Sequence, residues 1–384
     1  MPNKIWHPND FNSAQWFIHG SSINGLNWVP SIIPNPGTAE FLNLPEVLKE
    51  ILRLDKPDLI ATLEIGGIDI PVVSIEITTT TPQSQHAKQR VPRLVAASEA
   101  GIPSIYIIPE RKRSSGTLYS LGDDLFYGVD RIQQINQVPV FIYAYPDNNG
   151  VVLHDHTYPN QPDLTSVSIQ NAFRTIDAII QNKIGGNNIS TLYANPWISS
   201  EVSRHHTRGA RANIRIQNYG TLAEIQTTDL NTFLEHNTNM NRNHIDETIR
   251  KLPDRIISRR NTIIFRPGGR LFDHANDPYS GMLAFFDYVF CRTGRGVEDR
   301  NKNLIYMPIN AHIHNIVDEF SPQGYNKFWT CDCPFRTATI PTIDQQFEIS
   351  HHLQYGCVFT KIKPLRILGY FSDLIVFQDS MLVF

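Results

Sequence analysis

Two carboxylates stand at the ends of apolar runs that lie close together in the sequence. Asp58 opens the run DLIATLEI, and Glu76 lies near the end of the run PVVSIEIT. Because side chains alternate between the two faces of a strand, Glu76 and Thr78 share one face, whereas Ile75 and Ile77 belong to the opposite, apolar face. The pattern predicts a strand pair with one apolar face and with carboxylates on the other face.

The register of this strand pair decides whether the two carboxylates meet. The two runs flank Gly66-Gly67, which predicts a β-hairpin. With a three-residue loop, Gly66 to Ile68, Asp58 pairs directly across from Glu76, and the apolar sets of both strands share the other face. A two-residue loop would slip the register by one residue and separate the carboxylates. The hydrophobic pattern therefore favours the three-residue loop.

Two carboxylates that face each other across a hairpin repel and lower stability unless a cation lies between them. We expect Mg²⁺, because it prefers carboxylate, carbonyl and water oxygens and leaves positions open for a phosphate. The backbone carbonyl of Ile77 lies where a third oxygen ligand is needed. In the plainer interpretation Asp58 is a turn residue and Glu76 a solvated charge at a strand end. The matching register favours the metal site formed by Asp58, Glu76 and Ile77.

At this point the residues resemble the PD-(D/E)XK nuclease superfamily, whose fold many restriction endonucleases share. The resemblance rests on Pro57-Asp58, on Glu76-Ile77-Thr78, and on the helix and parallel strand expected after them. It spans about residues 38 to 145, less than half of the chain. The resemblance implies that Asp58 and Glu76 bind Mg²⁺ and that the residue at the third motif position activates or orients the attacking water.

The sequence departs from the family at this third position, where Thr78 stands in place of the usual lysine. A threonine side chain has neither the charge to stabilise a phosphorane nor a usable pKa. Lys88, about one turn into the helix expected after Pro82, is one candidate for the role, because residues 85, 88 and 89 would lie on one helical face. Gln89, which could orient water, is the other. The catalytic set that we expect is Asp58, Glu76, Thr78, Lys88 and Gln89.

The segments around the hairpin have the order of an α/β fold. Residues 38 to 54 have helical spacing with Thr38 as N-cap, and a second helix is expected from Pro82 to a C-cap at Gly101, kinked or split by Pro92. The run 104 to 108 predicts a strand, and the right-handed crossover rule makes it parallel to the strand that ends at Thr78. A further strand is expected over 138 to 147 and a helix over 168 to 182.

Charge is unevenly distributed along the chain. The whole sequence carries 34 Lys and Arg against 37 Asp and Glu, so any affinity for nucleic acid must come from local clusters. Residues 1–110 carry 7 basic and 11 acidic residues, whereas residues 201–270 carry 12 and 7. Clustered arginines suit phosphate contacts and solvated helix faces equally. As DNA-binding residues we select Arg204, Arg208, Arg211, Arg255, Arg259, Arg260, Arg266 and Arg270.

Length and composition suggest two units. With 384 residues, 41% of them hydrophobic, the chain can bury at least one large core. We expect a nuclease core with an N-terminal arm over residues 1–185, and a mixed α+β region over 186–384 that recognises DNA and also completes the core. The sequence MPNKIWHPNDF has no apolar leader segment, and four cysteines do not make a disulfide framework, which predicts a cytoplasmic protein.

The cysteines and histidines of the C-terminal region give a weaker signal. Cys331, Cys333, His351, His352 and Cys357 offer enough ligands for zinc, but C-x-C lacks the usual two-residue spacing of zinc-binding cysteine pairs. We expect these cysteines to be packing or edge thiols.

These observations predict a restriction-endonuclease-like α/β fold with a mixed sheet flanked by helices. The function expected is Mg²⁺-dependent hydrolysis of double-stranded DNA by a sequence-specific type II restriction enzyme. No P-loop is present, which favours an enzyme that works without a motor domain, and symmetric double-strand cutting would favour a homodimer. RNA cleavage and a repair role stay open. The alternative is a catalytically silent nucleic-acid-binding protein on the same fold, for which Thr78 is the best evidence.

Overall fold

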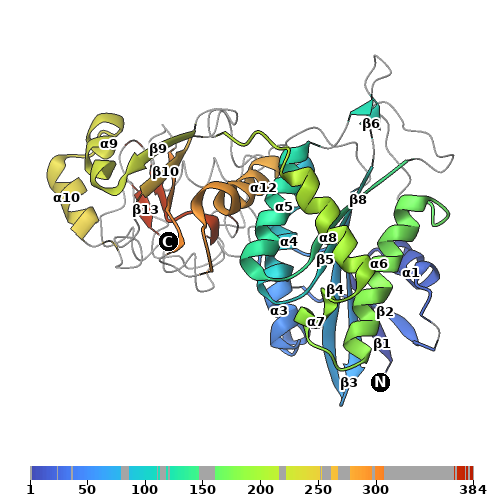
Figure 1. The fold of residues 1–384 in the computed structure, drawn as a ribbon. Coiled ribbons are helices and arrows are strands. Elements are labelled where there is room, and N and C mark those ends of the chain that lie inside the picture. The colour runs from blue at the N-terminus through green and yellow to red at the C-terminus, as the bar shows by residue number, and fades with distance from the viewer. Residues whose placement is uncertain are drawn as a thin grey trace. The chain divides into compact units, whose positions relative to one another are not determined.

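The computed structural model of the chain contains two compact units, Met1–Asn213 and Ile214–Phe384 (Figure 1). The structure describes residues 2–23, 25–35, 38–78, 86–109, 111–112, 118–119, 122–146, 161–215, 222–250, 252, 261–266, 277–295, 299–306, 367, 370–376, 378 and 381–383. The expected boundary near residue 185 falls before two helices, α7 (Ile189–Leu192) and α8 (Pro196–Gly209). They belong to the first unit because α8 packs against α5 (Asp123–Asn136).

A six-stranded mixed sheet forms the centre of the first unit. Its order is β2-β1-β3-β4-β5-β8. The strands are β1 (Asn3–His7), β2 (Trp28–Ile32), β3 (Leu59–Ile65), β4 (Ile68–Ile77), β5 (Ser104–Pro109) and β8 (Val140–Tyr145). β3 is antiparallel to β1 and β4, whereas β4, β5 and β8 run parallel to one another. The predicted α/β class and the parallel placement of β5 are confirmed.

Helices cover both faces of this sheet (Figure 1). On one face α1 (Phe11–Gly20) and α6 (Val167–Ile184) pack over the apolar side chains of β4, including Ile75 and Ile77. On the other face lie α3 (Glu46–Leu52), α4 (Val91–Glu99) and α5. Coverage of both faces explains why the parallel strands read as nearly continuous apolar runs in the sequence.

The β3–β4 hairpin sets Asp58 opposite Glu76 as expected, but its loop differs from the predicted one. Its loop has two residues, Gly66 and Gly67, with φ angles of 63° and 85°, and Ile65 pairs with Ile68. Such positive φ angles favour glycine. The prediction of a three-residue loop was therefore wrong. A β-bulge at Val72 adds the missing residue, because the register shifts between Ala61 and Thr62. Beyond the bulge Leu59 pairs with Ile75, which sets Asp58 opposite Glu76.

The helix expected over residues 38 to 54 is two helices, α2 (Ala39–Leu42) and α3, separated at Pro45. Thr38 is the N-cap of α2, as predicted, and its hydroxyl accepts a hydrogen bond from the Phe41 N–H at 3.3 Å.

The helix expected after Pro82 begins later than predicted. Its described part is a 3₁₀ turn, η1 (His86–Lys88), followed by α4. Pro92 neither kinks nor splits α4 but lies in its first turn, where the missing N–H costs nothing. Gly101, with a φ of 78°, follows the end of α4 as expected. Because α4 begins at Val91, Lys88 and Gln89 lie before the helix and do not share one of its faces.

The second unit contains its own five-stranded sheet, in the order β13-β12-β11-β10-β9. Its strands are β9 (Leu222–Gln226), β10 (Asn261–Phe265), β11 (Lys302–Tyr306), β12 (Leu374–Val376) and β13 (Met381–Val383), accompanied by α9 (Leu230–Asn237), α10 (Arg242–Arg250) and α12 (Asp277–Phe286). No described strand after Asn213 joins the six-stranded sheet. Within the described part of the chain, this region builds a core of its own instead of completing the first one.

None of the described helices combines the length and the apolar character needed to cross a membrane.

Candidate functional site

The carboxylates of Asp58 and Glu76 meet at the carboxyl end of β4. Asp58 directly precedes β3, and its Oδ2 accepts a hydrogen bond from the Ile77 N–H at 2.7 Å. One guanidinium nitrogen, Nη1 of Arg93, lies 2.5 Å from Glu76 Oε1 and 3.5 Å from Asp58 Oδ1. The two carboxylates therefore occupy the same side of the hairpin, which confirms the pairing that the sequence predicted.

Two arginines and a third carboxylate complete this cluster, and none of the three was predicted from the sequence. Arg93, on α4, also donates from Nε to Asp55 Oδ2 at 2.6 Å. Arg90, just before α4, places Nε 3.0 Å from Glu76 Oε1. The signal that could have found them is the spacing of the arginines around Pro92. A helix that starts at this proline sets Arg90 and Arg93 one turn apart, on neighbouring positions of one face.

Burial gives the cluster unusual protonation properties. Burial first, and then the negative charge of Glu76, raises the pKa of Asp58 to about 7, although Arg93 opposes the shift. Burial disfavours the charge of Arg93, but Glu76 and Asp55 together hold its pKa above the ordinary value. The metal-free site therefore keeps its arginine charged and binds a proton on Asp58 at mildly acidic pH.

The stability of the metal-free protein is expected to fall as pH rises from about 4 to about 7 because of Asp58. In that interval the folded state keeps a proton that the unfolded chain, with a pKa near the usual 3.8, has released. The stabilisation by this proton is complete below the unfolded pKa of 3.8, and it is lost once the pH exceeds the folded pKa of about 7. Asp58→Asn stays neutral, so its free energy of unfolding relative to the wild type should rise between about pH 4 and pH 7 in urea titrations.

The exposed Glu46→Gln variant is the control for this measurement, because it removes a carboxylate that lies outside the cluster. A difference between Asp58→Asn and the wild type that stays constant across this pH range would contradict the prediction.

Thr78 is held by two tyrosines beside the carboxylates. Its hydroxyl lies 3.3 Å from the Tyr106 hydroxyl, and its carbonyl accepts a hydrogen bond from the Tyr145 hydroxyl at 3.0 Å. Burial raises the pKa of Tyr106, which keeps this phenol neutral. Ile77, whose carbonyl was expected as a metal ligand, is the last residue of β4, so its carbonyl follows at the same strand end as Glu76. The strand end thus offers a fixed hydroxyl and a carbonyl next to two carboxylates.

The structure places Lys88 against another helix. The Lys88 ammonium is buried and forms an ion pair with Asp124 in the first turn of α5, with 2.5 Å between Nζ and Oδ2. Gln89 is half-buried in the turn between η1 and α4. A role for either residue in catalysis stays a prediction, and the described cations in direct contact with Glu76 are Arg93 and Arg90.

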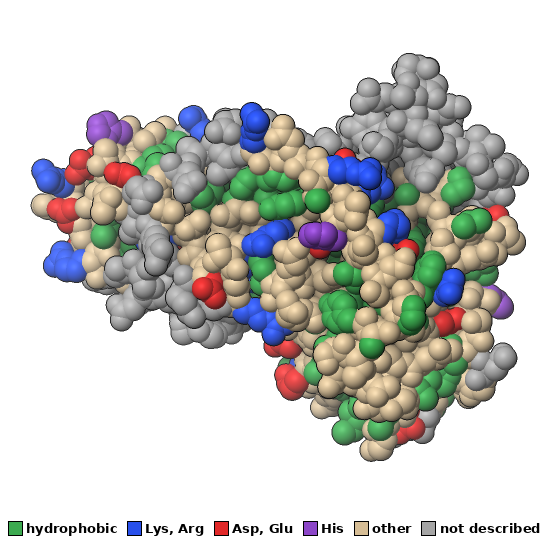
Figure 2. Space-filling view, in the orientation of Figure 1, with side chains coloured by type: hydrophobic (Ala, Val, Ile, Leu, Met, Phe, Trp, Pro, Cys, Tyr) green, Lys and Arg blue, Asp and Glu red, His purple; other side chains and the backbone are tan. Residues whose placement is uncertain are grey.

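Two of the selected arginines, Arg204 and Arg208, lie on an outer face of α8, and a third, Arg211, follows the end of this helix. Arg204 lies over the Tyr143 ring and is bound by Glu201, Arg208 lies 3.9 Å from the Phe126 ring centroid, and Arg211 is exposed. With Ser199, Ser200, Ser203 and Thr207 they line a hollow of about 840 Å³. Figure 2 shows several Lys and Arg side chains (blue) in the region where Figure 1 shows α8.

The other selected arginines are distributed differently. Arg266 is exposed in the second unit, with its guanidinium 5.4 Å from the Tyr306 ring centroid. The remaining four lie outside the described residues: Arg255, Arg259, Arg260 and Arg270. The cysteines and histidines weighed as zinc ligands, Cys331, Cys333, His351, His352 and Cys357, also lie outside them.

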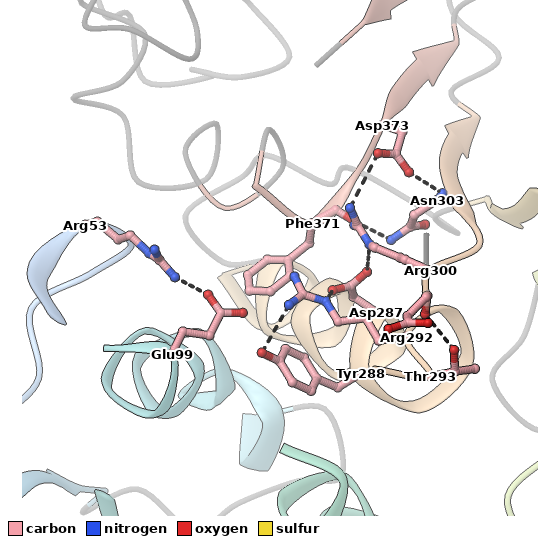
Figure 3. A network of polar contacts seen from close by, with 11 residues as sticks. Arg53, Glu99, Asp287, Tyr288, Arg292, Thr293, Arg300, Asn303, Phe371 and Asp373 are labelled. Atoms are coloured by element: carbon pink, nitrogen blue, oxygen red, sulfur yellow. Dashed lines mark hydrogen bonds and ion pairs between the residues drawn. The ribbon is translucent and has the colours of Figure 1, made fainter. Parts of the chain in front are cut away.

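A second cluster of charged side chains lies in the second unit (Figure 3). The carboxylate of Asp287 is fully buried and contacts two guanidinium groups, Arg292 Nε and, at 2.6 Å, Arg300 Nε. Arg300 also contacts Asp373, whose other oxygen accepts the Asn303 N–H at 2.8 Å. Because these charges pair with one another and join β11 to the segment before β12, we interpret the cluster as structural.

The residues around Asp58 and Glu76 fit a hard divalent cation. Glu76 Oε2 is buried and has no hydrogen-bond partner within the described structure, so one carboxylate oxygen of the cluster is left for another ligand. Among the described residues no group of three or more His, Cys, Asp or Glu side chains could hold a metal. A pair of carboxylates with a carbonyl is nevertheless sufficient for Mg²⁺, which keeps several waters and binds substrate phosphate.

Comparison with known proteins leaves the function to be argued from this geometry. The chain matches no family model, no curated protein sequence and no solved structure.

Proposed function

We propose that the protein is a Mg²⁺-dependent endonuclease of the restriction-endonuclease-like kind that hydrolyses double-stranded DNA. The observation that carries this proposal is the meeting of Asp58 and Glu76 around one guanidinium nitrogen, at the carboxyl end of β4. The antiparallel pair β3 and β4, followed by the parallel strands β5 and β8, is the arrangement that the resemblance implies. A type II restriction enzyme, a homodimer and a cytoplasmic location remain parts of the proposal.

Asp58, Glu76 and the Ile77 carbonyl would hold the metal. Glu76 Oε2, which has no partner among the described residues, is an oxygen left for the metal, and burial beside Glu76 raises the pKa of Asp58 even though Arg93 contacts both carboxylates. When bound there, Mg²⁺ would neutralise charge on the scissile phosphate and lower the pKa of a coordinated water.

Arg90 is suited to supply the positive charge that Thr78 lacks. Its side chain keeps a quarter of its surface exposed while Nε contacts Glu76, so the remaining N–H groups lie at the edge of the site. A guanidinium there would stabilise the negative charge that develops on the phosphate. The Thr78 hydroxyl, held by Tyr106, would orient water by a hydrogen bond.

The hollow lined by the outer face of α8 and by Arg211 just after it is the proposed DNA-backbone contact in the first unit. Reversing one charge there with Arg211→Glu is expected to weaken DNA binding and to reduce the slope of log K against log salt by about 1, because fewer counterions are released. The measurement is the Kd for a duplex at several salt concentrations without metal. Charge reversal at Arg259 and Arg260 is expected to weaken DNA binding and to reduce the salt slope in the same way.

Lys183→Glu is the matched control for Arg211→Glu, because Lys183 lies on α6 and does not line the hollow of α8. An equal salt slope for Arg211→Glu and the wild type would contradict the assignment of this face.

The alternative function, a catalytically silent nucleic-acid-binding protein, is favoured by one observation. Arg93 already lies between the carboxylates, and its guanidinium neutralises part of their charge without a metal. Digestion of plasmid DNA with Mg²⁺ separates the two functions. Discrete fragments would indicate a sequence-specific enzyme and a smear a general nuclease. DNA that is bound but stays intact would support the silent protein.

A further inference from the structure

A second pocket lies on the face of the sheet opposite Asp58 and Glu76. It has a volume of about 630 Å³ and is lined by α1, α6 and the first turn of α8. α6 packs on the apolar face of β4, whereas Glu76 faces α4 through its ion pair with Arg93. The pocket is therefore separated from the proposed nuclease site by the sheet, and its size is within the range of about 300 to 1,000 Å³ that is usual for small-molecule sites.

An arginine in this pocket is held in place without an acidic partner. The Arg174 guanidinium lies 4.1 Å from the ring centroid of Trp197. The indole is itself fixed, because its N–H donates to Thr175 Oγ1 at 2.8 Å. Arg174 makes no hydrogen bond or ion pair with any residue that the structure describes. Its planar set of N–H donors is thus oriented by stacking and remains available to a ligand.

The one carboxylate of the pocket is already occupied. Asp177 accepts hydrogen bonds from the Ser21 hydroxyl at 2.9 Å, the Ser22 N–H at 3.0 Å and the Ser22 hydroxyl at 2.5 Å. The side chains of Gln170 and Gln181 form no hydrogen bond to other described residues. The pocket therefore presents the Arg174 guanidinium and the amides of Gln170 and Gln181, with His19 and Asn195 also in its lining, a set that favours an anion over a cation.

An apolar wall adjoins these polar groups. It consists of Leu164, Phe173 and Ala178. Phe173 approaches α1 so closely that a Cβ on Gly20 would lie 2.0 Å from its ring. Only glycine at position 20 allows this placement of the ring. The wall offers a surface on which a planar ring could pack, and the Gln170 amide lies about one helical turn from Phe173 on the same helix.

We propose that this pocket binds a mononucleotide, that is, a phosphate monoester that carries a planar heterocycle. Arg174 would bind the phosphate through paired N–H donors, and the amide of Gln170, about one helical turn from both Phe173 and Arg174, would hydrogen-bond the edge of the heterocycle, which packs against the Phe173 wall. The proposal does not depend on the nuclease function, because no residue of the pocket belongs to the Asp58 cluster.

The test is calorimetric titration of the full chain, without metal, with nucleoside monophosphates, the matching nucleosides and inorganic phosphate. Binding of at least one nucleoside monophosphate, tighter than its nucleoside and tighter than phosphate, is the expected result. Phosphate that binds as tightly as every nucleotide would overturn the proposal, since only an anion site would remain. A nucleoside that binds equally well, or no binding at all, would overturn it too.

Arg174→Gln should weaken the nucleotide about tenfold or more, the loss expected for charge-assisted hydrogen bonds. Gln170→Leu should weaken binding of the nucleotide and leave the affinity for inorganic phosphate unchanged. Lys183→Gln, a loss of the same charge on the same helix outside the pocket, should have no effect. Arg174 and Gln170 are exposed, so these variants should fold. Unchanged nucleotide affinity in Arg174→Gln would refute the assignment.

Discussion

Replacing Glu76 by glutamine is expected to abolish Mg²⁺-dependent cleavage of DNA while DNA binding without metal stays nearly intact. The variant keeps the shape of the side chain but removes the negative charge that, together with Asp58, would bind the proposed Mg²⁺. Loss of one charge-stabilising group in an active site costs about 10²- to 10³-fold in rate, and loss of a metal ligand should cost at least as much. Single-turnover cleavage of a plasmid measures the effect.

The control for Glu76→Gln must account for stability, because Glu76 is buried against Arg93 and removal of one partner of a buried ion pair costs about 3 to 5 kcal/mol. Asp55→Asn provides it. Asp55 also binds Arg93 but belongs to no expected set of metal ligands. Both variants should therefore unfold at a lower temperature, and only Glu76→Gln should stop cutting. Wild-type cleavage by Glu76→Gln, or an equal loss in Asp55→Asn, would contradict the nuclease assignment of this hairpin.

The carboxylate pair could be predicted from the sequence because it depends on local alternation. The apolar faces of β3 and β4 fix which side chains share a side, whatever connects the strands. The loop itself was not predictable in the same way. Two loop residues with a bulge at Val72 and three loop residues without one give the same pairing beyond Ala61, and the hydrophobic pattern does not distinguish them.

The positive charges were harder to predict than the negative ones because they depend on where α4 begins. Pro82 and Pro92 both suit the first turn of a helix, and the choice between them changes the residues that face Glu76. A start at Pro82 would turn Lys88 and Gln89 toward the site, whereas the observed start at Val91 turns Arg90 and Arg93 there. Only packing against β4 decides between the two.

The boundary between the units was placed too early for a related reason. α8 looks like a polar, arginine-bearing helix in the sequence, but His205 is buried on its inner side. The Ile142 N–H donates to His205 Nε2 at 2.7 Å, and burial together with the nearby Arg204 charge lowers the pKa of this histidine to about 4. A neutral histidine that accepts from β8 joins α8 to the first unit. Contacts between residues so far apart in the chain leave no local pattern.

Arg90→Ala is expected to slow the chemical step by about 10²- to 10³-fold, because Arg90 is the proposed source of transition-state charge stabilisation. Its Nε lies 3.0 Å from Glu76, and part of the side chain reaches the surface, where a phosphate could meet it. Metal-free DNA binding should change little, and Arg90→Lys should recover part of the rate because it restores the charge without the planar donor set. Single-turnover rates at saturating enzyme isolate this step from binding.

Lys88→Ala is the comparison variant for Arg90→Ala, because Lys88 was the cation that the sequence predicted for this role. Its ammonium is buried against Asp124, so the loss should appear as a lower free energy of unfolding, while the cleavage rate of the folded protein stays close to that of the wild type. If Lys88→Ala were instead inactive and Arg90→Ala fully active, the missing lysine's role would belong to Lys88. In that case Arg90 would serve only to neutralise Glu76, and Lys88 would have to leave Asp124 when DNA binds.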